Sequence, residues 1–341
     1  MTAAAELVAT PPARTSFDIV RAAFVELRVR DLAASEHFYA DLLGMVVAAR
    51  TEDAVYLRGW EERQHHSLIL RRGVEPAAAR LAFRVRAEED LDRLAGHLDA
   101  PARWEAAGQD PGMGRSLRLF DPFGFPLEFF HEIELCETQH QRFDLHRGAP
   151  LLRFDHLNLH CPQVEDTFRF WLSMGFRCSE YISTDDPQDE RITGAWLRRK
   201  PTVHDVALTA GAGPRLHHFA YWVAEPAGVL RACDQLAGAR QSCVIERGPG
   251  RHGVSNAFFV YLRDPDGHRI ELYTCDYYTG DPDHPPLRWS VTDPRCRSFW
   301  GTQAPDSWYE ESSVVLGPDD RPVAIHEAGV DERAQRSQVP A

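Results

Sequence analysis

Two similar octapeptides punctuate the chain, DPFGFPLE at 121–128 and DPDGHRIE at 264–271. Each follows an apolar stretch (SLRLF or AFFVYLR) and precedes another (FF or LYT). An Asp-Pro-x-Gly sequence between two apolar runs predicts a tight turn that joins two strands. The second strand of each pair then carries a glutamate, Glu128 in one copy and Glu271 in the other. These stretches therefore indicate an internal repeat.

Other segments repeat in the same order. Residues 21–45 parallel residues 153–176, each as a strand, a short loop and an amphipathic helix that ends at Gly44 or Gly175. HHSLIL then parallels VHDVALT, and RLAFRV parallels HHFAYWV. Both members of the last pair precede a segment of helical period, RAEEDLDRLAGHL or AEPAGVLRACDQLAGA. Four matches in one order indicate a structural module that is copied along the chain.

The repeats divide the chain into four modules, at residues 20–75, 78–135, 150–212 and 214–276. Each reads as a strand, a helix and three strands, so we predict four βαβββ modules of an α+β fold. Two curled, mixed and mostly antiparallel sheets are expected, with a C-terminal extension. Side chains at alternate strand positions would point into a concave interior.

At the domain level, we expect a flexible N-terminal leader at residues 1–19, followed by a two-module scaffold domain without metal at 20–145. A two-module catalytic domain with a metal site follows at 146–280. The extension covers 281–341, is rich in proline and aromatic residues, and ends in a segment, VDERAQRSQVPA, with the composition of a disordered tail.

Composition limits the possible partners. The chain has 341 residues, a formal net charge of −13 and 43% hydrophobic residues. Nucleic acids and anionic membranes both require a basic face, so neither is expected as a partner. No apolar run reaches the roughly 18 residues of a membrane-spanning helix. Seven scattered cysteines without a C-x-x-C motif are typical of a reducing cytoplasm.

The two halves differ where the repeat carries possible metal ligands. The second half has His156 where the first has Phe24, and His218 where the first has Arg80. With Glu271, the second half offers two imidazoles and one carboxylate on three strands. This set is the facial triad of non-haem iron enzymes, which leaves about three positions for a chelating substrate and O₂. A single histidine on a strand is usually a core residue, but three repeat-matched residues in one half predict a site for one Fe(II) or Mn(II) ion.

Several residues near these ligands are candidates for acid–base chemistry or binding. His204 lies on the predicted strand VHDVALT and has a pKa suited to proton transfer. Tyr261 lies on the strand AFFVYLR, and Arg247 and His252 flank the predicted loop ERGPGRHGVSN. For each of these residues, the alternative is a purely structural role. His217 is expected to be the outward-facing neighbour of the ligand His218.

One motif is misleading. Residues 248–253, GPGRHG, satisfy the pattern G-x-G-x-x-G but contain a proline and precede an apolar strand. A dinucleotide-binding loop would precede a helix instead, so no such site is expected.

The paired modules, the F-Y-x-D-x-L-G segment from Phe38 to Gly44 and the terminal glutamate resemble the vicinal oxygen chelate superfamily. The segments VHDVALT, RLHHFAYWV, ERGPGRHGVSNAFFVYLRDPDGHRIELYT and DYYTGDPDHPP are most similar to its extradiol ring-cleaving dioxygenases. The resemblance covers about residues 20–315 and implies a homotetrameric oxidoreductase that inserts both atoms of O₂ into a catechol. It places the metal ligands at His156, His218 and Glu271. The remaining site residues that it implies are His204, Tyr261 and His252 for catalysis and Asn158, Trp196, Arg247 and Arg297 for substrate binding.

The resemblance also implies 3,4-dihydroxyphenylacetate as substrate and 5-carboxymethyl-2-hydroxymuconate semialdehyde as product. Arg247 and Arg297 would then hold the substrate carboxylate. Three alternatives remain open: a dioxygenase for another catechol of the 2,3-dihydroxybiphenyl type, a glyoxalase-like isomerase or transferase, and a small-molecule sequestering protein. No counterpart is recognised for residues after 325.

Overall fold

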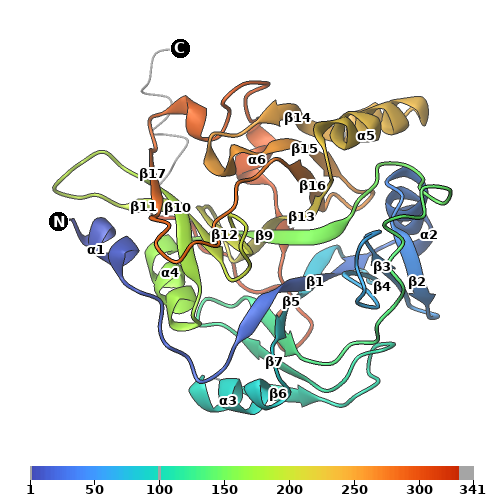
Figure 1. Cartoon of the computed structure of the whole chain (residues 1–341), viewed down its shortest axis with the longest axis horizontal. Helices are drawn as coiled ribbons and strands as arrows, with labels where there is room; N and C mark the ends of the chain where they lie inside the picture. Colours follow the sequence, from blue (N-terminus) through green and yellow to red (C-terminus); the bar gives the residue numbers. More distant parts are fainter. Residues whose placement is uncertain (1, 99–100, 330–341) are drawn as a thin grey trace.

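The computed structural model describes residues 2–98 and 101–329 (Figure 1). The N-terminal half consists of two βαβββ modules. The first comprises β1 (Ile19–Val29), α2 (Leu32–Glu36), η1 (His37–Leu42), β2 (Val46–Arg50), β3 (Ala54–Arg58) and β4 (Leu68–Arg72). The second comprises β5 (Ala77–Val85), α3 (Glu89–His97), β6 (Ala102–Glu105), β7 (Ser116–Phe120) and β8 (Pro126–Phe130).

The C-terminal half repeats the pattern. Its first module comprises β9 (Arg153–Cys161), α4 (Val164–Ser173), β10 (Arg177–Ser183), β11 (Ile192–Arg198) and β12 (Val206–Ala210). Its second comprises β13 (Arg215–Trp222), α5 (Pro226–Gly238), η2 (Ser242–Val244), β14 (Ile245–Arg251), η3 (Val254–Asn256), β15 (Phe258–Arg263) and β16 (Arg269–Thr274). The four predicted modules are therefore confirmed.

Each half forms one mixed sheet. The N-terminal order is β2-β3-β4-β1-β5-β8-β7-β6, and the C-terminal order is β14-β15-β16-β13-β9-β12-β11-β10 followed by β17. The first strand of each module pairs in parallel with the last strand of the same module, and the other pairs within a module are antiparallel. The two modules of each half join through an antiparallel pair, β1 with β5 and β9 with β13.

The predicted Asp-Pro-x-Gly turns form as expected. The Asp121 carboxylate accepts backbone hydrogen bonds from Phe123 and Phe125, at 2.9 and 2.8 Å. Asp264 accepts the equivalent bonds from Asp266 and His268. An aspartate that accepts such bonds stabilises a turn, and a glycine takes the left-handed position that follows.

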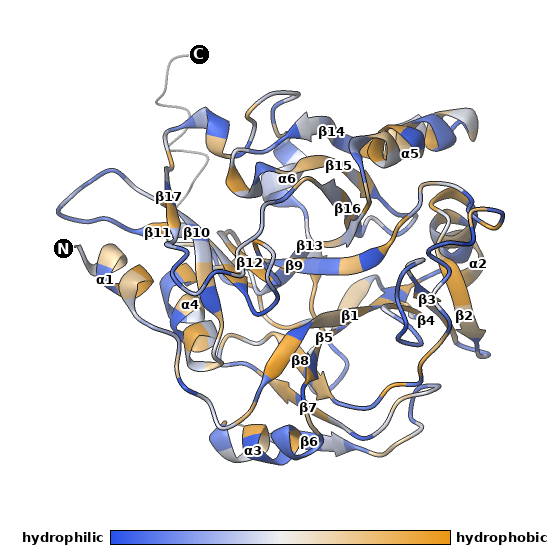
Figure 2. Cartoon of the chain, in the orientation of Figure 1, coloured by the Kyte–Doolittle hydropathy of each residue, from blue (hydrophilic) through white to orange (hydrophobic). Residues whose placement is uncertain are grey.

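One hydrophobic core extends through both halves, and polar contacts join them. Tyr39 donates to Asp264 at 2.9 Å. The Asp205 carboxylate accepts from the backbone N–H of Ala22 on β1, at 3.0 Å, and from the backbone N–H groups of Arg199 and Lys200. Figure 2 shows hydrophobic residues on many strands but also hydrophilic ones on β9, in the middle of the molecule. Buried polar side chains need hydrogen-bonding or ionic partners, so the polar residues of β9 are candidates for a functional site.

The terminal segments add to the two sheets. Residues 1–19 were expected to be a flexible leader, yet they include helix α1 (Ala3–Ala9), whose Ala4 and Leu7 are buried. In the extension, β17 (Leu287–Ser290) pairs in parallel with β10, and β18 (Ser313–Val314) pairs with β13. Between them lie η4 (Pro294–Cys296) and α6 (Asp306–Glu310). The predicted disordered tail lies outside the described residues, and the domain boundaries stay a prediction.

Within the described ranges, no helix has both the length and the apolar character needed to cross a membrane.

Candidate metal centre

Five cross-strand neighbours form a row on one face of the C-terminal sheet. In order across β9, β13, β16, β15 and β14, they are His156, Ala220, Glu271, Tyr261 and Arg247. Direct neighbours on adjacent strands point to the same face, so all five side chains enter one interior. Ala220 is the smallest of them and leaves room between the histidine and the glutamate.

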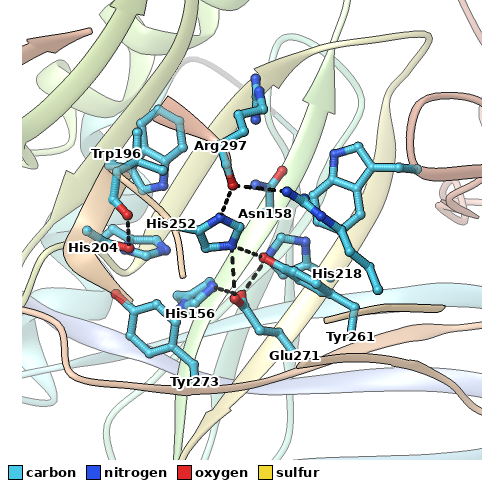
Figure 3. A pocket seen from close by; sticks show the side chains of 14 residues that line it. His156, Asn158, Trp196, His204, His218, His252, Tyr261, Glu271, Tyr273 and Arg297 are labelled. Carbon is cyan, nitrogen blue, oxygen red and sulfur yellow. Dashed lines mark hydrogen bonds and ion pairs between the residues drawn. The ribbon is translucent and has the colours of Figure 1, made fainter. Parts of the chain in front are cut away.

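His218 completes the group from two positions before Ala220 on β13, and therefore from the same face. Ligand atoms of His156, His218 and Glu271 all lie within 4.8 Å of one another, and all three residues are buried. The Nε2 atoms of His156 and His218 lie 3.0 and 3.2 Å from the same oxygen, Oε2 of Glu271. Figure 3 shows the histidine rings directed at this carboxylate. The three predicted ligands are thus brought together.

The hydrogen bond at the far side of the His156 ring supports a metal ion between this ring and Glu271. Nδ1 of His156 lies 2.8 Å from Oδ2 of Asp155, which as a carboxylate can only accept. The Nδ1 atom therefore carries the proton of the neutral ring, and the Nε2 lone pair faces Glu271. A lone pair directed at a carboxylate is unfavourable unless a cation lies between them. The donor set therefore fits a divalent ion of the kind bound by two imidazoles and one carboxylate.

The pKa values of the group also suit a cation. Burial alone would raise the pKa of Glu271, but the neighbouring imidazoles of His156 and His218 outweigh it when they carry positive charge, and the pKa is held well below its usual range. Burial lowers the pKa of His218 to about 4 despite the neighbouring Glu271. For His156, the carboxylates of Asp155 and Glu271 outweigh burial and raise the pKa. A metal ion at Nε2 would compete with a proton there.

His204 lies beside the ligands, but not on a strand as predicted. Strand β12 begins at Val206, so His204 belongs to the preceding loop. Its ring centroid lies 3.8 Å from that of His156. Its Nδ1 is buried and has no hydrogen-bond partner among the described residues. Burial lowers the pKa of His204 well below its usual value, which keeps the ring neutral and able to accept a proton.

Tyr261 and His252 form a hydrogen-bonded pair on the opposite side of Glu271. The Tyr261 hydroxyl lies 2.9 Å from Nε2 of His252, and the same Nε2 lies 3.7 Å from Oε1 of Glu271. Nδ1 of His252 contacts the backbone carbonyl of Arg297. Burial raises the pKa of Tyr261 well above its usual value, so its hydroxyl is a proton donor at neutral pH.

Arg247 was predicted to flank a loop, but it lies on strand β14. Its Nη2 donates to the carbonyl oxygen of Arg297 at 2.9 Å and to Oγ of Ser298 at 2.7 Å. Within the described chain, its Nε and Nη1 have no hydrogen-bond partner although the residue is only 2% exposed. Burial lowers the pKa of Arg247 to about 10, so it remains a cation at neutral pH. A buried guanidinium with two nitrogens that lack a hydrogen-bond partner is suited to bind an anion.

All ten predicted site residues line one pocket, with an empty volume of about 370 Å³. Asn158 lies beside His218 on the neighbouring strand and accepts from Thr209 at 2.9 Å. Trp196, on β11, and Arg297, after η4, line the same pocket. The prediction missed four further lining residues, namely Val254, Ser255, Tyr273 and Trp308.

Trp308 is the most informative of these. It is 5% exposed and packs its ring against Tyr261, with centroids 4.4 Å apart. The aromatic composition of the extension was the available signal, but that segment has no repeat partner that could assign a position. His217 was expected to face outward, yet it is 2% exposed and lies beneath α6. Its Nε2 lies 3.0 Å from the backbone carbonyl of Trp308.

Comparison with known proteins agrees with the fold. The family model of the Glyoxalase/Bleomycin resistance protein/Dioxygenase superfamily matches residues 21–129 and 153–272. The chain is 33% identical to a manganese-dependent 2,3-dihydroxybiphenyl 1,2-dioxygenase of Geobacillus genomosp. 3, over 80% of this chain and 90% of that protein. It is 31% identical to a metapyrocatechase of Geobacillus stearothermophilus, over 88% and 95%. A solved homoprotocatechuate 2,3-dioxygenase from Brevibacterium fuscum, in complex with 3,4-dihydroxyphenylacetate, is 45% identical with a TM-score of 0.89, over 93% and 99%.

Proposed function

This chain belongs to the Glyoxalase/Bleomycin resistance protein/Dioxygenase superfamily and, within it, to the extradiol ring-cleaving dioxygenases, and from that premise we propose that its substrate is 3,4-dihydroxyphenylacetate. The product would be 5-carboxymethyl-2-hydroxymuconate semialdehyde, formed by insertion of both atoms of O₂ next to the diol. The carboxylate of this substrate is the anion that would pair with the unpartnered donors of Arg247.

We propose that His156 and His218, each through Nε2, and Glu271, through its carboxylate, hold one Fe(II) or Mn(II) ion. When bound, such an ion acts as a Lewis acid that lowers the pKa of a coordinated phenol and offers an adjacent position for O₂. Asp155 orients the His156 ring through its Nδ1–H. A histidine held in this way presents a fixed lone pair at Nε2.

The proposed acid–base residue is His204. Its Nδ1 has no hydrogen-bond partner among the described residues, and its ring is neutral at pH 7, so the ring can take a proton from a catechol hydroxyl and return it later. The Tyr261 hydroxyl, whose proton is directed to Nε2 of His252, would accept a hydrogen bond from a substrate hydroxyl. The Asn158 side chain would orient a small molecule beside His218.

At the other end of the pocket, Arg247 is proposed to bind the substrate carboxylate, with Arg297 close by. A guanidinium pairs with a carboxylate through two parallel N–H···O bonds, and Arg247 retains two free N–H-bearing nitrogens for this purpose. A biphenyl-type catechol would leave those buried donors unpaired, which is costly. Trp196 would form an apolar wall for the ring. The buried, half-partnered Arg247 is the observation that carries the choice of substrate.

The test is O₂ uptake by protein with assayed iron and manganese, supplied with 3,4-dihydroxyphenylacetate, 4-methylcatechol or 2,3-dihydroxybiphenyl. We expect fastest uptake and a yellow ring-opened product with the carboxylate-bearing catechol. The Arg247→Met variant should raise KM for that substrate about 10- to 100-fold, the loss expected for a hydrogen bond to a charged group. KM for 4-methylcatechol should not change, and Arg251→Met on the same strand serves as the matched control.

Two outcomes would count against this assignment. Preference for 2,3-dihydroxybiphenyl would retain the reaction and reject the substrate. Metal-loaded protein that consumes no O₂ with any of the three catechols would favour the glyoxalase-like isomerase.

We also propose a homotetramer in the cytoplasm. Exposed aromatic residues in the linker and the extension, Phe143, Phe299 and Trp300, support contacts between copies. Among the described residues, Cys136, Cys161, Cys178, Cys233, Cys243 and Cys275 are free thiols, which supports a reducing compartment. Light scattering after size-exclusion chromatography would give the mass of the assembly.

A further inference from the structure

A chain of contacts leads from the C-terminal extension to the proposed ligand His218. Nε2 of His217 lies 3.0 Å from the carbonyl oxygen of Trp308 on α6, and Nδ1 of His217 lies 2.6 Å from Nδ1 of His218. All three residues are buried. The extension therefore lies two hydrogen bonds from the metal centre.

The direction of these hydrogen bonds follows from the carbonyl. A carbonyl oxygen only accepts, so Nε2 of His217 carries a proton. A neutral imidazole has one N–H, and the Nδ1 atom of His217 must then accept. The short contact between the two Nδ1 atoms requires a proton between them, which belongs to His218. His218 consequently carries its proton on Nδ1 and presents an unprotonated Nε2 toward Glu271, 3.2 Å away.

Helix α6 is held in place for this contact by Arg269, whose side chain is fully buried. Its Nη1 donates to the backbone carbonyl of His217 at 3.0 Å, and its Nη2 donates to that of Ser307 at 3.1 Å. Glu246 binds the same guanidinium and accepts from the Ser307 hydroxyl at 2.7 Å. Arg269 and Glu246 thus fix the distance between strand β13 and helix α6.

We propose that His217 is a positioning residue that sets the tautomer of His218, and that the Trp308 carbonyl makes helix α6 part of the metal-binding apparatus. The inference rests on the proposed function, because it needs His218 as a ligand. It extends that function by making metal affinity depend on a segment outside the four modules. A histidine that only filled space would be replaceable by any residue of similar shape.

The experiment measures Mn(II) affinity of the apoprotein, by competition with a chelator and by the electron paramagnetic resonance signal of free Mn(II). His217→Phe keeps the shape of the ring but removes the acceptor for His218. His217→Asn keeps an acceptor oxygen close to the position of Nδ1. We expect the Phe variant to raise the Kd for Mn(II) about 10- to 100-fold, as for other residues that orient metal-bound histidines. The Asn variant should stay close to the wild type.

His66→Phe is the matched control. His66 is also buried and also contacts a neighbouring histidine, His65, through Nδ1 atoms 2.9 Å apart, but it lies in the N-terminal half. This variant should bind Mn(II) like the wild type. His217→Leu replaces the Phe variant if the latter does not fold, as judged by near-ultraviolet circular dichroism.

Equal loss of affinity in the Phe and Asn variants would overturn the inference, since packing alone would explain it. Unchanged affinity in the Phe or Leu variant would also overturn it. If the wild type binds Mn(II) and opens catechols, these results leave the proposed function intact. A wild-type protein that binds neither Mn(II) nor Fe(II) would instead reject the proposed function.

Discussion

The N-terminal sheet contains a row of cross-strand neighbours that matches the metal-centre row strand by strand. Its members on β1, β5, β8 and β7 are Phe24, Ala82, Glu128 and Arg118. The alanine and the glutamate are the same in both rows, whereas a phenylalanine takes the place of His156. Both halves therefore build the same concave frame and differ in what fills it.

The difference centres on Arg80, which occupies the position of His218. Its Nη1 lies 2.6 Å from Asp110 and 3.1 Å from Glu128, and its other nitrogens contact Glu26. A buried carboxylate on this row is costly without a cation. In the N-terminal half the chain supplies that cation itself as a guanidinium. In the C-terminal half two neutral imidazoles leave the place of the cation to a metal ion.

Replacing the glutamate of each half with alanine should give the largest difference between two variants in metal content and turnover. Glu271→Ala removes the carboxylate ligand, so bound metal and ring cleavage should both fall to background. Glu128→Ala should leave metal content and turnover unchanged, because Arg80 retains Glu26 and Asp110 as partners. Metal analysis and O₂ uptake on the two variants provide the check. Loss of metal in the Glu128 variant would contradict the assignment of the site to one half.

Replacing Arg80, the cation of the N-terminal half, should lower the stability of the fold but leave the bound metal unchanged. Arg80→Met would leave three buried carboxylates without their shared partner and should destabilise the protein by about 3–5 kcal/mol at pH 7. Arg80 holds the pKa values of Glu26 and Asp110 down, although burial opposes it. Without it, the carboxylates would take up protons more readily, and the deficit should shrink as the pH falls. Urea unfolding at pH 7 and pH 5 measures both effects.

Two histidines at matched positions, His204 and His66, should differ in their effect on turnover. His204→Asn should leave bound metal intact and lower kcat about 100-fold, the lower end for an acid–base residue. His66 does not line the pocket, so the variant His66→Asn should not change kcat. Single-turnover kinetics on metal-loaded protein make the comparison. Equal kcat for the wild type and the His204 variant would remove its proposed acid–base role.

An effect confined to the pH dependence of stability should come from Glu180, which stands where the N-terminal half has Ala49. Its carboxylate accepts from the backbone N–H of Ser255 and from the side chains of Tyr277 and Trp289. Burial raises the pKa of Glu180 to about 7, although these three hydrogen bonds lower it. The folded state therefore binds its proton more tightly than the unfolded state. The resulting stabilisation is complete below the unfolded pKa and is lost as the pH rises through about 7.

In denaturant titrations between pH 4 and pH 8, Glu180→Gln should remove this component, which amounts to at most about 1.4 kcal/mol per pH unit. Ala49→Gln serves as the control in the matched strand and should keep the wild-type pH dependence. Identical pH dependence in the wild type and Glu180→Gln would show that the carboxylate stays charged throughout.

The sequence was sufficient to predict the modules and the metal group because each position could be compared with its repeat. His156 and Phe24, for example, could be told apart only after the strands that carry them were aligned. Predictions failed where that comparison was lacking. The extension has no repeat partner, so Trp308 was not placed in the pocket and the cover over His217 was not foreseen. Arg247 was predicted to flank a loop, whereas pairing with β15 places it on a strand.

Asp205 adds a consequence for how the molecule unfolds. This residue follows His204 directly, and its carboxylate binds the amide of Ala22 in the first strand of the other half. Opening of the loop that carries His204 would therefore break a contact of β1, and fraying of β1 would release the loop. Two halves joined in this way, over one continuous hydrophobic core, are expected to exchange their amide hydrogens as a single cooperative unit. Opening of the reactive pocket to water would then require both halves to open together.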